Sequence, residues 1–81
     1  MNKILVEIIA RFAVFLEFAD ESEIQLETSV QQQEELAFRL QKLSQPEREE
    51  FILVLHEIAE NNPFPDQREY LLNLPHAIGI D

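Results

Sequence analysis

Cysteine is absent from this chain of 81 residues. Disulfides and thiolate zinc sites are therefore excluded as sources of stability, and the absence of cysteine fits the cytosol. One domain of this length buries only roughly 60 to 65% of its unfolded surface when it folds. We therefore expect efficient helix packing or self-association to stabilise it.

Glycine and histidine are scarce, with one and two residues respectively. A phosphate-binding loop needs several glycines, and no cysteine nucleophile is available for covalent catalysis. The acidic positions around Asp20, Ser22 and Ile24 also lack the turn glycine of an EF-hand. We expect no enzyme activity, no cofactor and no metal site.

Basic residues are the third shortage, because six Lys and Arg face sixteen Asp and Glu, giving a formal net charge of -10. A field of this sign repels phosphate backbones and anionic lipids and attracts cationic surfaces. We therefore expect a basic protein partner, with neither a nucleic acid nor a membrane as partner.

The most apolar segment runs from Ile4 to Ala19, where only Glu7, Arg11 and Glu17 are charged. These charges and the length, below the ~20 apolar residues of a membrane span, argue against a transmembrane helix and a cleaved signal peptide. Glu7 and Arg11 lie four residues apart, so we expect them to pair. A helix this apolar is normally buried on several sides. We expect it to be central and wrapped by other helices, or to form a homodimer interface.

Capping residues predict where the next two helices begin. Thr28 or Ser29 is expected to cap the second helix, which then runs to about Leu43. Ser44 is expected to cap the third, with Glu47 three residues later closing a capping box. The third helix therefore has the clearest start signal in the chain.

Prolines and the single glycine predict the C-terminal elements. The third helix should end at residues 61–63, because the residue before a proline is pushed out of the helical region. A fourth helix should run from residue 65 to residue 74, where Pro75 stops it. Gly79 is expected to adopt a left-handed conformation that folds Ile80 back as in a Schellman cap. The predicted fold is one all-α domain, residues 1–81, with four helices and a terminal turn.

Acidic residues dominate the predicted loop, which has the sequence DESEIQLE from Asp20 to Glu27. Carboxylates of this density serve either as a solvated loop or as a docking surface for arginine-rich proteins. Phe38 departs from its helix pattern, because at about 100° per residue it points away from the apolar stripe. Either a neighbouring element covers it, or it is an interface anchor ringed by acids. The predicted partner-binding residues are Asp20, Glu21, Glu23, Glu27, Glu34, Glu35 and Phe38.

His56 and Glu60 lie four residues apart and are the best metal-binding candidates on one helix. Two ligands are too few for a site, so we interpret them as part of a solvated face. The distant third alternative for function is a metal- or ligand-binding helical domain.

An apolar helix, an acidic loop, LQKLSQPEREEF (40–51) and PDQREYLLNLPHAIGI (65–80) follow one another in the chain. This order resembles that of small acidic helical bacterial proteins, some of them similar to immunity proteins that neutralise toxins. The resemblance implies a bacterial helical fold and carries over no site residue. With the charge, it favours an immunity-type or inhibitory protein of the cytoplasm that binds a basic partner such as a toxin. The alternative is a homo-oligomeric structural or adaptor protein whose acid serves solubility only.

Overall fold

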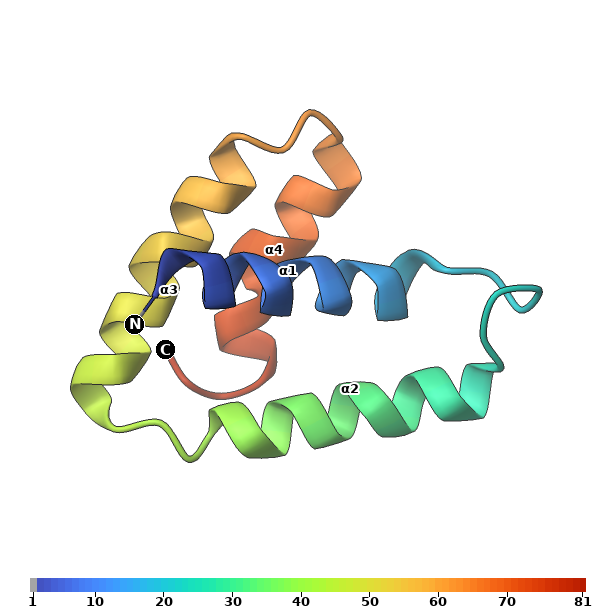
Figure 1. The fold of residues 1–81 in the computed structure, drawn as a ribbon, viewed down its shortest axis with the longest axis horizontal. Coiled ribbons are helices and arrows are strands. Elements are labelled where there is room, and N and C mark those ends of the chain that lie inside the picture. Colours follow the sequence, from blue (N-terminus) through green and yellow to red (C-terminus); the bar gives the residue numbers. More distant parts are fainter. Residues whose placement is uncertain (1) are drawn as a thin grey trace.

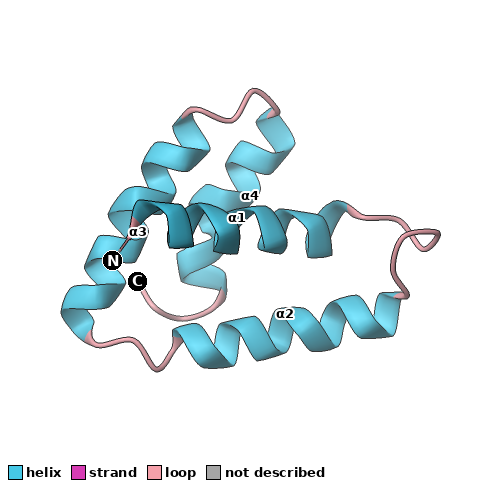
Figure 2. Ribbon diagram, viewed as in Figure 1, coloured by secondary structure: helices cyan, strands magenta, loops and turns pink. Residues whose placement is uncertain are grey.

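Residues 2–81 are described by a computed structural model, in which they form four helices and no strand. The predicted all-α fold is thereby confirmed. In Figure 1, α1 crosses in front of α3 and α4, and α2 returns antiparallel to α1 along the lower edge. Short loops join the helices, as Figure 2 shows. The helices are α1 (Lys3–Phe18), α2 (Leu26–Leu40), α3 (Gln45–Glu60) and α4 (Pro65–Ala77).

Side-chain caps fix the start of α1 and of α3. The Asn2 carboxamide oxygen accepts a hydrogen bond from the Ile4 amide at 2.7 Å. At α3, the Ser44 amide donates to the Glu47 carboxylate at 2.9 Å, and the Glu47 amide donates to the Ser44 hydroxyl at 3.4 Å. The predicted capping box is confirmed.

The predicted start of α2 is wrong, because the helix begins at Leu26 and its N-cap residue, Gln25, makes no side-chain cap bond. Ser29, which we expected as a possible cap, is buried within the helix. Its hydroxyl donates to the main-chain carbonyl of Leu16 in the last turn of α1. Helix ends leave such carbonyls without partners inside the helix. Ser29 therefore closes the end of α1 and fastens α2 to it.

The end of α2 also differs from the prediction, because the helix stops at Leu40 and residues 41–43 form a turn. Arg48 of α3 folds over this turn. Its guanidinium donates to the Leu43 carbonyl at 3.1 Å and to the Gln41 carbonyl. The turn is therefore held by a side chain from the following helix.

The end of α4 corrects a third boundary, because the helix continues through Pro75 to Ala77. A proline this close to the helix end removes only the backbone bond to Leu71, so the last turn tolerates it. Beyond it, Gly79 has a φ of 77°, and the Ile80 amide donates to the Pro75 carbonyl at 3.0 Å. The predicted Schellman cap is confirmed, and it buries Ile80.

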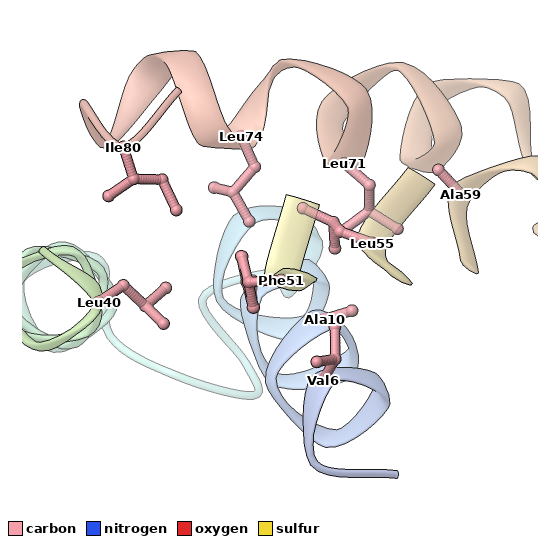
Figure 3. Packing of buried hydrophobic residues seen from close by; sticks show 10 residues of the cluster. Val6, Ala10, Leu40, Phe51, Leu55, Ala59, Leu71, Leu74 and Ile80 are labelled. Carbon is pink, nitrogen blue, oxygen red and sulfur yellow. The ribbon is translucent and has the colours of Figure 1, made fainter. Parts of the chain in front are cut away.

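The core lies between α1 and the α3–α4 pair, with Leu40 of α2 and Ile80 closing one end (Figure 3). In residues 2–81, α1 packs against each of the other helices, whereas the backbone of α2 comes close to that of α1 alone and α2 reaches the shared core through Leu40. α1 is thus central, yet the expectation that the other helices wrap it is met on one side only. The buried residues of α1 are Val6, Ala10, Ala13 and Leu16.

Candidate protein-interaction surfaces

All seven predicted partner-binding residues are exposed. The first three lie in the α1–α2 loop, at the end of the molecule that projects beyond α3 and α4 in Figure 1. The other four lie on α2. We call this set the acidic surface: Asp20, Glu21, Glu23, Glu27, Glu34, Glu35 and Phe38.

Asp20 organises the α1–α2 loop. Its carboxylate accepts hydrogen bonds from the Ser22 hydroxyl and from the Ser22 amide, the latter at 2.9 Å. Its carbonyl accepts from the amides of Glu23 and Ile24 at 3.0 and 3.1 Å. The hydrogen bonds from the Ser22 hydroxyl and amide lower the pKa of the Asp20 carboxyl. The loop is therefore a hydrogen-bonded turn in which the Asp20 carboxylate is stabilised in its charged form.

Three of the four α2 members of the acidic surface form one stripe. Glu27, Glu34 and Phe38 are seven and four residues apart, which places them on the same helix face. Ser29, buried against α1, lies half a turn away from Phe38 on the opposite face. The stripe therefore points outward from the fold.

Phe38 is 56% exposed, so no neighbouring element covers it. The interpretation of Phe38 as a core residue, which the sequence left open, is wrong. The Lys42 ammonium lies 4.6 Å from the centre of its ring. The ring face therefore already accepts one cation, in the geometry of a cation–π contact.

Leu26 is a second exposed apolar side chain on this side, 65% accessible at the first turn of α2. It shares a shallow hollow of about 290 Å³ with Glu21, Gln25 and Glu27. The residue pattern placed Leu26 inside the predicted loop, so it did not indicate an exposed apolar side chain at the start of a helix. The acidic surface thus contains apolar side chains between its carboxylates.

Cations are kept away from the acidic loop. Seven acids and no base occupy residues 12–38. Of the six basic residues, Arg39 and Lys42 have partners on α2, Glu35 and the Phe38 ring, and the other four have partners away from the acidic surface. Lys3 lies 3.8 Å from Glu57, and Arg39 lies 2.7 Å from Glu35. Glu7 and Arg11 form the predicted pair at 3.4 Å. Arg68 donates to the Asn62 carbonyl. Arg48 donates to the carbonyls of Leu43 and Gln41 in the turn after α2. No base within residues 2–81 compensates the charge of the loop.

The second candidate surface is the outer side of α1, where five large apolar side chains are between 40 and 67% exposed. Sequence analysis could indicate this surface only as one alternative, because apolarity around the whole helix does not show which side is covered. None of its members is charged. We call it the α1 apolar face: Ile4, Leu5, Ile8, Phe12 and Phe15.

A groove of about 620 Å³ adjoins the α1 apolar face and separates α1 from the α3–α4 loop. Val14 and Phe15 line it from α1, Ile58 and Leu71 from α3 and α4, and Phe64 from the loop. Phe64 is exposed. The residue pattern did not indicate this exposure, although Pro63 and Pro65 on either side of Phe64 restrict the backbone there. Charged and polar side chains line it as well, among them Glu7, Arg11 and Asn62, so the groove is of mixed character.

His56 and Glu60 are both exposed on α3. Within residues 2–81, no three His, Cys, Asp or Glu side chains gather in a way that could hold a metal ion. None of the described helices is long and apolar enough to cross a membrane.

Comparison of the chain with family models, curated proteins and solved structures finds no match. The resemblance to immunity-like bacterial proteins therefore stays a prediction. Any functional conclusion depends on the two surfaces themselves.

Proposed function

We propose that this chain is a small acidic protein-binding module of the immunity or inhibitory type, which binds a basic protein such as a toxin. The observation that carries the proposal is the segregation of charge. Residues 12–38 hold seven acids and no base, and the predicted binding residues among them are exposed. Carboxylates arranged in this way can occupy a cationic groove in place of a phosphate backbone.

Exposed apolar side chains within the acidic surface supply what charge alone does not. Surface charges mainly accelerate association, whereas buried apolar and aromatic anchors slow dissociation. Phe38 and Leu26 are such anchors, at the two ends of α2. An arginine of the partner can stack on the Phe38 ring in place of Lys42. The surface therefore combines steering with anchoring.

A homo-oligomeric structural or adaptor protein is the second candidate, and the α1 apolar face favours it. In that case the acid serves solubility, and self-association is the function. A toxin gene beside the gene for this chain supports the first candidate, and a conserved neighbourhood without toxins supports the second.

The two candidates are separated by an affinity pull-down from the native host, eluted with a salt gradient, followed by a charge-matched comparison. Replacing Glu21, Glu23 and Glu27 by Gln removes three carboxylates from the acidic surface. The control replaces Glu49, Glu60 and Glu69 by Gln, which removes the same charge from exposed positions of α3 and α4.

We expect the first triple variant to lose the basic partner at low salt and the control to retain it. Equal retention by both variants would show that the acid contributes only solubility. Equal loss would show that net charge matters and that the α1–α2 loop is no specific site.

A further inference from the structure

We propose that the α1 apolar face is a homodimer interface, in which α1 of a second copy packs antiparallel along it. Leu5, Ile8, Phe12 and Phe15 are separated by three, four and three residues. Alternating steps of three and four place apolar side chains along a seam that a second helix can follow. All four are exposed, while the opposite side of α1 is buried in the core. The helix therefore presents a seam with no covering element in residues 2–81.

Charge identifies the second copy as the occupant. The α1 apolar face has no charged member, and the charges beside it are already paired, Glu7 with Arg11 and Lys3 with Glu57. A basic protein drawn in by the overall field finds no free carboxylate on this face. Two copies can meet here without opposing their acidic surfaces, which lie on the α1–α2 loop and the outer side of α2. The inference is therefore independent of the function proposed for the acidic surface.

The acidic loop determines the orientation. In a parallel pair, the two α1–α2 loops would lie side by side, each with Asp20, Glu21 and Glu23. In an antiparallel pair, they lie at opposite ends of α1, whose 16 residues span about 24 Å. That separation exceeds the Debye length of about 8 Å at physiological salt. Repulsion therefore favours the antiparallel pair, with Leu5 facing Phe15 of the partner subunit and Ile8 facing Phe12 of the partner subunit.

The area fits a dimer of moderate affinity. Five side chains of this size, about half exposed, present roughly 500 Å² of apolar surface. Phe64, which is 60% exposed beside the groove, adds to this area, and a stable interface buries roughly 800 Å² per partner. We therefore expect dissociation in the micromolar range.

Sedimentation equilibrium tests the interface with a matched pair of variants. The wild type should reach twice the 9.5 kDa of one chain in the micromolar range. Ile8→Glu, 57% exposed, should raise the dimer dissociation constant by about 30-fold or more, because symmetry places two carboxylates in the interface. Leu53→Glu, 67% exposed on α3, adds the same charge and should leave dimerisation unchanged. Thermal melts should confirm that both variants fold.

Three results would overturn the interface: a wild type that stays at 9.5 kDa up to millimolar concentration, an unaffected Ile8→Glu dimer, or equal weakening by Leu53→Glu. Orientation is tested by oxidising single-cysteine variants, since the chain has no cysteine of its own. Leu5→Cys and Phe15→Cys should form a disulfide when mixed and not when each is alone. Cross-linking of Leu5→Cys with itself would overturn the antiparallel arrangement.

Discussion

The acidic surface and the α1 apolar face meet at the same helical hairpin but differ in every physical property that governs binding. The first is an exposed set of carboxylates with single apolar side chains among them, and its field extends into solvent. The second is a continuous apolar seam whose neighbouring charges are neutralised in pairs. The net charge of -10 therefore describes neither surface by itself, because the two surfaces attract different partners by different forces.

Salt should separate the two surfaces most strongly. Raising ionic strength until the Debye length falls from about 10 Å to about 3 Å should slow association with a basic partner by roughly 10- to 100-fold. Dissociation should change far less. The homodimer should hold or tighten, because burial of apolar surface is not screened. Stopped-flow association and sedimentation across one salt series measure both, and parallel weakening of the two would contradict the comparison.

Phe38→Ala should act on one surface only. Losing an aromatic anchor of about 2 kcal/mol raises the dissociation rate of the basic partner by about 30-fold. Because Phe38 is mostly exposed, the melting temperature and the dimer constant should not change. Surface plasmon resonance and a thermal melt on the same protein measure these quantities. A large fall in melting temperature with unchanged partner kinetics would exclude Phe38 from the interface.

Ser29→Ala should lower the stability of the fold that positions both surfaces. It removes the buried hydroxyl that donates to the Leu16 carbonyl, so the free energy of unfolding should fall by roughly 1 to 3 kcal/mol. Ser22→Ala removes an exposed hydroxyl from the loop and should be nearly neutral. Urea titration of the two variants measures the contrast. If Ser29→Ala lowered the free energy of unfolding as little as Ser22→Ala does, the α1–α2 contact would not depend on Ser29.

Tyr70 gives an effect that is confined to alkaline pH, at the point where α1 ends. Its ring meets Phe18 edge to face at 5.7 Å, and burial, then the nearby Glu17, raise its pKa from 10.0 to about 12. The folded state therefore favours the neutral phenol. Its contribution to stability is complete below pH 10 and is lost as pH rises towards 12.

Tyrosinate absorbance measures this directly, because Tyr70 is the only tyrosine and the chain has no tryptophan. Tyr70→Phe should flatten the loss of unfolding free energy between pH 10 and 12. A titration midpoint near 10 in the folded protein would contradict the burial of the phenol.

Sequence predicted the features whose partners are close in the chain. The Ser44–Glu47 box and the Gly79 turn each close within five residues, so residue type and spacing determine them. The capping role assigned to Ser29 failed because its partner lies 13 residues away on another helix. The helix end predicted at Pro75 was wrong for a different reason. A proline near a helix end removes only one backbone hydrogen bond, so the helix can continue through it.

The candidate surfaces, like the fold, could be predicted only where a local pattern of residues determines them. Helical periodicity gave the outward direction of Phe38, but not whether another element would cover it. The exposure of Ile8 and Phe12 depends on how much surface three short helices can cover, which no local pattern of α1 contains. Acidic residues of the loop were predictable as exposed because charge is rarely buried without a partner.

Among the helices of residues 2–81, the backbone of α2 comes close to that of α1 alone. The local stability of α2 should therefore be lower than that of the other helices. Amide protons of α2 should exchange with solvent before those of α3, because fewer buried contacts oppose a local opening of that helix. The Gln41 side chain, 2.8 Å from the Ile78 carbonyl, tethers the C-terminal end of α2, and Ser29 fastens its first turns to α1, so opening must break one of these two contacts. A protein that binds the acidic surface would suppress this opening. Its binding would therefore slow the exchange of amide protons along the whole of α2.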